Sequence, residues 1–134
     1  MIPEPSHSPM RILLLTYTGG AGGVAVLLRT LLERFKENEE FHFEVCITQE
    51  LGTVAEEIAA LGVPLHFLGM SGGLDLKNGM KLVKVIREGR FDVVDFHGII
   101  PLVRLLVALA HPHVQIINEH GAVQGDRARG RGFF

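Results

Sequence analysis

Apolar and polar residues follow two different periods along the chain, and the changes of period divide it into strands and helices. A continuous apolar run over 11–16 predicts a strand that is buried on both faces. After a glycine-rich segment, apolar residues recur at steps of three and four over 24–35, which predicts an amphipathic helix. Over 41–47, apolar residues alternate with His42 and Glu44, which predicts a second strand.

The same patterns continue through the rest of the chain. A capping box at Thr53 and Glu56 predicts a short helix that runs to Leu61 and is closed by Gly62. The remaining expected elements are a strand over 63–68, a helix capped by Asp75 that runs to about Arg87 and is ended by Gly89, a strand over 91–96, a helix over 101–110 opened by Pro101, and a strand over 114–119. Five strands that alternate with four helices predict an α/β fold, with a doubly wound, parallel, Rossmann-like sheet of strand order 3-2-1-4-5.

Three features of the sequence converge on one edge of this expected sheet. The first and fourth strands are neighbours in the expected order, and such sheets bind ligands at the carboxyl ends of their strands. The glycine segment (19–23) follows the first strand, His97 follows the fourth and His120 follows the fifth. We therefore expect one crevice that is lined by glycine main chain and by two imidazoles.

The glycine segment offers main-chain N–H groups at the start of a helix. Four of its residues have no side chain: Gly19, Gly20, Gly22 and Gly23. A phosphate or diphosphate can approach such a backbone and interact with the helix dipole, whereas a tight strand-to-helix turn explains the same residues without a ligand. The segment also fits the dinucleotide pattern G-x-G-x-x-A, but Glu50, the nearest acidic residue, lies further along than that pattern expects.

His97 and His120 each end an expected strand, and each is followed by glycine. An imidazole at such a position can donate a hydrogen bond to a sugar hydroxyl or a phosphate oxygen, or it can transfer a proton. The structural alternative is a histidine that only bonds neighbouring carbonyls. Asp95 lies two residues before His97, so we expect both side chains on the same face. These three residues have no recognised metal-ligand spacing, and no metal site is predicted. The other strand and loop histidines are expected at the surface or at loop edges: His42, His66, His111 and His113.

Composition narrows the classes of function. The 134 residues carry 13 Lys and Arg against 15 Asp and Glu, a formal net charge of -2, so nucleic acid is not expected as a partner. The single cysteine, Cys46, excludes an internal disulfide and a cysteine-based zinc site, and its alternating strand predicts a core position. We find no secretory leader pattern, and the apolar stretch over 99–110 is too short to span a bilayer, so we expect a cytoplasmic protein.

Three segments are expected along the chain. They are a disordered, Pro- and Ser-rich extension over 1–9, a Rossmann-like domain over 10–121, and a basic, glycine-rich tail over 122–134. The tail is expected to be solvated, with a peripheral contact with an acidic membrane at its inner face as the alternative. Because the chain stops soon after the fifth expected strand, we expect a fragment of a longer fold or a chain that works with a second one.

Six short motifs occur in a characteristic order along the expected domain. They are Met10-Arg-Ile-Leu-Leu-Leu, Gly19-Gly-Ala-Gly-Gly, Phe43-Glu-Val-Cys-Ile-Thr, Leu61-Gly-Val-Pro-Leu, Phe91-Asp-Val-Val-Asp-Phe-His97 and Ile117-Asn-Glu-His120-Gly121. Their order and spacing resemble the N-terminal domain of the family-4 retaining glycosyltransferases of the GT-B fold. In that fold two Rossmann-like domains face each other, the N-terminal one holding mainly the acceptor and the C-terminal one the nucleotide-sugar donor.

The resemblance implies a role in moving a sugar from a nucleotide-diphospho-sugar to an acceptor such as a lipid or polysaccharide precursor. It implies no metal and no other cofactor. It also implies that the glycine segment contacts the donor diphosphate or the acceptor, that catalytic His120 lies near the transferred sugar with Gly121 beside it, and that His97 lines the acceptor side. The donor-binding domain is missing from this sequence, so the chain is expected to be inactive alone.

Two alternatives remain open from the sequence. The chain can be a small NAD(P)-binding Rossmann domain, or it can be a non-catalytic half that works with a separate chain carrying the donor domain. Stabilisation by NADH but not by nucleotide sugars would favour the first alternative. Co-purification with a second Rossmann-like chain would favour the other.

Overall fold

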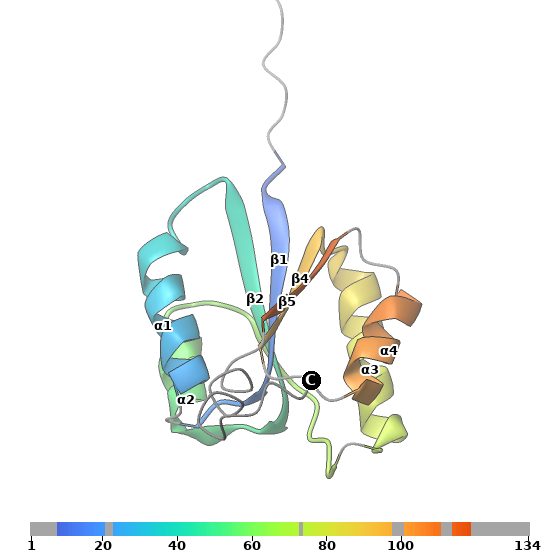
Figure 1. The fold of residues 1–134 in the computed structure, drawn as a ribbon. Helices are drawn as coiled ribbons and strands as arrows, with labels where there is room; N and C mark the ends of the chain where they lie inside the picture. The colour runs from blue at the N-terminus through green and yellow to red at the C-terminus, as the bar shows by residue number, and fades with distance from the viewer. Residues whose placement is uncertain (1–7, 21–22, 73, 98–100, 111–113, 119–134) are drawn as a thin grey trace, which may run out of the picture.

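The described residues form a five-stranded parallel sheet with helices on both faces (Figure 1). The computed structural model describes residues 8–20, 23–72, 74–97, 101–110 and 114–118. The strands are β1 (Met10–Thr18), β2 (Phe41–Glu50), β3 (Leu65–Phe67), β4 (Val93–His97) and β5 (Val114–Asn118). The helices are α1 (Gly23–Phe35), α2 (Gly52–Ala60), α3 (Leu76–Gly89) and α4 (Pro101–Ala110). The sheet order is β3-β2-β1-β4-β5 and all pairs are parallel, which confirms the predicted α/β class and topology.

The central strand β1 is buried on both faces, as its continuous apolar run predicts. Leu13 and Leu15 belong to the core under α3 and α4, whereas Leu14 belongs to the core under α1 and α2. Figure 1 shows these two helix pairs on opposite sides of the sheet. Each fully buried leucine stabilises the fold by about 1.5–3 kcal/mol relative to an exposed one. The two cores together therefore fix β1 in the middle of the sheet.

The start of α2 differs from the prediction: Thr53 does not cap the helix, so the predicted capping box is wrong. The helix begins at Gly52, two residues earlier than a cap at Thr53 implies, and its N-cap residue, Leu51, makes no side-chain cap. Instead the backbone amides of Val54 and Ala55 donate to the carbonyl oxygen of Gly19, at 2.8 and 3.2 Å. The residue that follows β1 thus satisfies the helix amides that a capping side chain would otherwise bind.

Helix α3 starts as predicted but ends differently. The Asp75 side chain accepts a hydrogen bond from the Asn78 amide at 3.2 Å, which confirms the predicted cap. At the other end Gly89 is still helical, and Arg90 takes the left-handed conformation with φ of 49°. A Cβ atom on Gly89 would lie 2.2 Å from the ring of Phe91, so glycine is required there for packing rather than for a left-handed turn.

The remaining boundaries lie close to their predicted positions. β3 has three residues, fewer than the predicted 63–68, and β4 begins two residues after the predicted start at Phe91. Of the predicted extension over 1–9 only residues 8 and 9 are described, and the predicted tail over 122–134 lies outside the described residues. None of the described helices is long and apolar enough to cross a membrane.

Candidate functional site

The carboxyl ends of β1, β4 and β5 lie next to one another. In the strand register Thr16 of β1 pairs with His97 of β4, and His97 pairs with Asn118 of β5. Gly19 follows Thr16 by three residues, and His120 follows Asn118 by two. The sheet therefore brings the carboxyl ends of β1, β4 and β5 to one edge. Three predicted site residues lie outside the described residues: Gly22, His120 and Gly121.

The side chain of His97 is enclosed and faces Asp95. Its Nε2 atom lies 2.9 Å from Asp95 Oδ2, and the two side chains are 6% and 18% exposed. Both residues share a sheet face with Leu14, which is the face that α1 and α2 cover. The predicted common orientation of this pair is thus confirmed.

Gly19 packs tightly against the junction between β2 and α2. A Cβ atom there would lie 2.0 Å from the carbonyl oxygen of Leu51. The Gly19 amide donates to the Glu50 carbonyl oxygen at 2.7 Å, and the Gly20 amide donates to Thr18 Oγ1 at 3.0 Å. Both N–H groups are therefore bonded to oxygens of the protein itself. The turn explains the glycine at position 19 without a ligand.

Gly23 lies in a different environment at the other end of the glycine segment. It is the first residue of α1 and is exposed, and a Cβ atom on it would meet no atom within 4 Å. The first turn of α1 has no acidic residue to interact with the helix dipole. An anion is therefore favoured at this helix end. Among the described glycines of the segment, Gly23 offers the most open approach to the main chain.

Glu50 ends β2 beside this segment. It is in register with Thr18, whose Oγ1 donates to Glu50 Oε2 at 3.3 Å. Dinucleotide-binding sheets hold the cofactor's ribose with an acidic residue near the end of the second strand. The position of Glu50 matches that requirement, although its distance along the sequence from the glycines does not.

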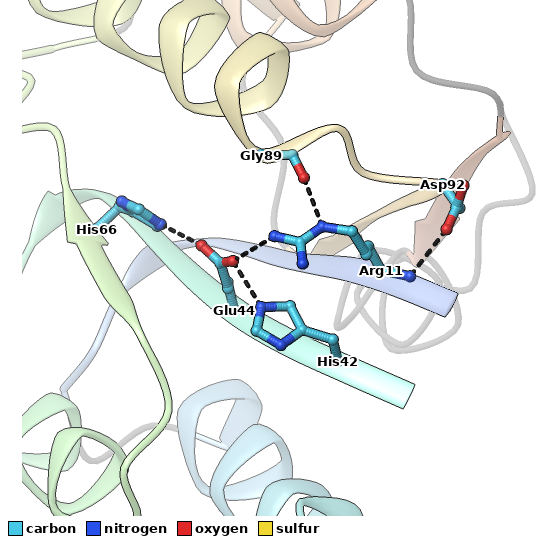
Figure 2. A network of polar contacts seen from close by, with 6 residues as sticks. All are labelled: Arg11, His42, Glu44, His66, Gly89 and Asp92. Atoms are coloured by element: carbon cyan, nitrogen blue, oxygen red, sulfur yellow. Dashed lines mark hydrogen bonds and ion pairs between the residues drawn. The ribbon is translucent and has the colours of Figure 1, made fainter. Parts of the chain in front are cut away.

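A polar cluster that the sequence analysis missed lies towards the amino ends of the strands. Figure 2 shows the Glu44 carboxylate at its centre, 3.0 Å from Arg11 Nη2 and 2.7 Å from both His42 Nε2 and His66 Nε2. Arg11 Nε also donates to the Gly89 carbonyl oxygen at 2.6 Å. We call Arg11, His42, Glu44 and His66 the Glu44 cluster. It joins β1, β2 and β3 to the end of α3.

The Glu44 cluster corrects the prediction for two histidines. His42 and His66 lie within strands rather than at loop edges, and their rings, which are 34% and 33% exposed, contact a nearly buried carboxylate. Burial alone would raise the pKa of Glu44, but hydrogen bonds from His66 and His42 outweigh it and hold that pKa below its ordinary value. The sequence contained one signal for this cluster, namely that His42 and Glu44 alternate with apolar residues in an inner strand. Polar groups within a covered sheet need polar partners.

Two other sequence predictions concern reactive or metal-binding side chains. Cys46 is fully buried, as predicted, and burial raises the pKa of its thiol. Within the part of the chain that the structure describes, no group of three or more His, Cys, Asp or Glu side chains is arranged to hold a metal ion.

Comparison with protein families supplies the chemical context for this geometry. The family model described as Glycosyltransferase Family 4 matches residues 21–133, so the match begins within the glycine segment and extends past His97 and His120. A search of curated proteins and a search of solved structures gave no match. The matched range covers most of the chain, and the parallel sheet has the order expected for the N-terminal half of such enzymes. The chain therefore belongs to glycosyltransferase family 4 and corresponds to the family's N-terminal, Rossmann-like domain.

Proposed function

We propose that this chain forms the acceptor-side wall of a glycosyltransferase that uses a nucleotide-diphospho-sugar as donor. The acceptor is a compound with a free hydroxyl group, such as a lipid or polysaccharide precursor. The observation that supports this proposal is the meeting of β1, β4 and β5 at one sheet edge, with Gly23 opening α1 there. The family match supports the reaction class, and the meeting of these strand ends supports this edge as its proposed place.

In the proposed reaction the acceptor oxygen forms a bond to the anomeric carbon while the bond from that carbon to the diphosphate breaks. In this proposal the acceptor hydroxyl gives its proton to the imidazole of His120, and negative charge develops on the leaving diphosphate. Main-chain amides and the positive end of the α1 dipole at Gly23 would stabilise that charge. Gly19 and Gly20 shape the turn that positions this helix end, and Gly22 is proposed to leave room for the ligand.

The two histidines are proposed to act on the sugar and the acceptor. His97 would donate a hydrogen bond to the acceptor from the end of β4, with Asp95 holding its ring in position. His120 is proposed as the catalytic residue near the transferred sugar, with the Gly121 main chain beside it. Both roles depend on the two strand ends lying side by side, which the pairing of His97 with Asn118 supports.

We further propose that these 134 residues do not catalyse transfer by themselves. One α/β sheet supplies one wall of the cleft, and a second Rossmann-like domain, on the same polypeptide or on a partner chain, must supply the donor-side wall. The arginines of 122–134 are proposed to remain solvated or to contact an acidic membrane surface.

A thermal-shift titration separates this proposal from dinucleotide binding. The chain is heated with a panel of nucleotide-diphospho-sugars and, separately, with NADH, each from the micromolar to the millimolar range. We expect at least one nucleotide sugar to raise the melting temperature in a saturable way, because a ligand that binds only the folded state stabilises it. A saturable rise with NADH that Glu50→Gln abolishes, together with no response to any nucleotide sugar, would overturn the proposal.

A further inference from the structure

A groove lies between β3 and α3. Its volume is about 490 Å³. The side chains that matter for its chemistry are Arg11, His66, Phe67, Lys81, Lys84 and Val85. In β1, Arg11 precedes Gly19 by eight residues, which corresponds to roughly 25 Å of extended strand. Arg11 and Glu44 thus place one end of the groove in the amino half of the sheet, whereas Phe67 ends β3 and is level with Thr16 of β1 through Ile47 of β2.

Glu44, one of the two carboxylates that line the groove, is already paired with neighbouring side chains. Figure 2 shows that Glu44 contacts Arg11, His42 and His66. Its negative charge is therefore already paired within the Glu44 cluster. Glu88 is the other carboxylate that lines the groove, against the cations of Arg11, Lys81 and Lys84. Three cations and two carboxylates leave the groove with a net positive charge even when both histidines are neutral. An anion is therefore the favoured ligand.

Two lysines on α3 are placed to hold that anion together. Lys81 and Lys84 are three residues apart, so they lie on the same face of the helix, and both are exposed along the groove. Lys81 Nζ lies 3.5 Å from the Leu68 carbonyl oxygen, a long contact that a stronger acceptor can replace. The Lys84 ammonium group has no hydrogen bond or ion pair with any described residue. A dianion such as a phosphate monoester can interact with both ammonium groups at once.

The rest of the groove is suited to an apolar group. Phe67 is 45% exposed in β3, and the partly buried side chain of Val85 lines the opposite wall. A ligand that covers them removes apolar surface from water and gains stability in proportion to the area covered. The combination of cations with an adjacent aromatic ring favours a phosphate attached to an apolar group over a bare phosphate ion.

We propose that the groove between β3 and α3 binds a phosphate monoester, whose phosphate lies between Lys81, Lys84 and Arg11 and whose apolar part covers Phe67. Such a group is carried by a small phosphorylated metabolite or by the headgroup of a phosphorylated lipid. The proposal does not rest on glycosyl transfer, because the groove shares no described residue with the proposed sugar-binding site around Gly23 and His97.

The test is a titration of the full ¹⁵N-labelled chain, followed by NMR, with phenyl phosphate and with inorganic phosphate. We expect phenyl phosphate to shift the amide signals of His66, Phe67 and Lys84 in a saturable way, and to bind more tightly than inorganic phosphate. Lys84→Gln and Lys81→Gln should each weaken binding by about fivefold. Arg34→Gln removes the same charge from exposed α1 on the other face and should leave the affinity unchanged.

A parallel measurement identifies the source of the phosphate. The chain is sedimented with phosphatidylcholine vesicles that contain phosphatidic acid and with vesicles that do not. Recruitment to the phosphatidic acid vesicles that Lys84→Gln abolishes and Arg34→Gln does not would support a lipid headgroup, whereas phenyl phosphate binding without recruitment would support a soluble metabolite. The absence of saturable binding to every probe, or equal weakening by Lys84→Gln and Arg34→Gln, would overturn the proposal.

Discussion

At the scale of single residues, Glu44 links three strands of the sheet and, through Arg11, the end of a helix. Its carboxylate is 11% exposed and holds Arg11, His42 and His66 from three adjacent strands. Through Arg11 the contact extends to the carbonyl oxygen of Gly89 at the end of α3. Removing the charge would leave the guanidinium and both imidazoles with a weaker acceptor. A buried polar group that loses its hydrogen-bond partner in this way lowers the free energy of unfolding by about 1–3 kcal/mol.

We therefore expect Glu44→Gln to lower the free energy of unfolding by about 1–3 kcal/mol at pH 7. The folded-state pKa of Glu44 lies below its ordinary value of 4.5, so this contribution is complete above about pH 4.5 and is lost as the pH falls through the folded pKa. Urea unfolding at several pH values should show the variant approaching the wild type in acid. Glu37→Gln, at a carboxylate that is 86% exposed, is the control. A constant difference across the acid range would contradict this account.

Substitution by alanine is expected to destabilise the fold at one glycine of the segment and not at another. Gly19→Ala places a Cβ 2.0 Å from the Leu51 carbonyl oxygen and should cost about 1–3 kcal/mol of stability, whereas Gly23→Ala meets no atom within 4 Å and should not destabilise the fold. Urea unfolding of both variants checks this. Equal stability of the two variants would mean that the turn does not pack as described.

The proposed catalytic role of His120 is tested by its removal. In the presence of the donor-binding domain, His120→Ala should reduce transfer by at least about 100-fold, the usual effect of losing a group that transfers a proton. The unfolding midpoint should change little. Transfer is measured with a radiolabelled nucleotide sugar. Turnover equal to that of the wild type would remove His120 from the site.

At the scale of helices and strands, the ends of elements depend on tertiary contacts. The amphipathic and alternating patterns predicted the type and order of every described element, because burial of apolar residues determines them. The start of α2 could not be predicted, since its amides bind the carbonyl oxygen of Gly19 from a distant part of the sequence. Asp75 could be predicted as a cap because its carboxylate accepts from the amide of Asn78, which lies only three residues further along the chain.

The end of α3 offers a test of this distinction. Gly89→Ala would place a Cβ 2.2 Å from the Phe91 ring, so we expect a loss of about 1–3 kcal/mol even though alanine favours helix more than glycine does. Gly72→Ala, where a Cβ meets no atom within 4 Å, is the matched control. Thermal unfolding measures both. A stabilised Gly89→Ala variant would show that helix propensity outweighs the contact with Phe91.

At the scale of the whole molecule, the parallel sheet separates two regions of different chemistry. The carboxyl edge carries the exposed start of α1 at Gly23 and the enclosed imidazole of His97, and the opposite half carries the Glu44 cluster and the positively charged groove. The sequence predicted the first region because strand order alone brings those residues together. It did not predict the second, since Arg11, Glu44 and His66 belong to three strands and no local pattern joins them.

The central claim is that the carboxyl edge contacts the diphosphate of the nucleotide sugar, and a site-resolved titration tests it most directly. Nucleotide-diphospho-sugars are added to the ¹⁵N-labelled chain while the amide signals of Gly23, Val24 and His97 are followed. The account predicts that these three signals shift together with one dissociation constant, and that Gly22→Val weakens binding without unfolding the chain. Signals that remain unchanged at this edge at saturating ligand, or a Gly22→Val variant with unaltered affinity, would contradict it.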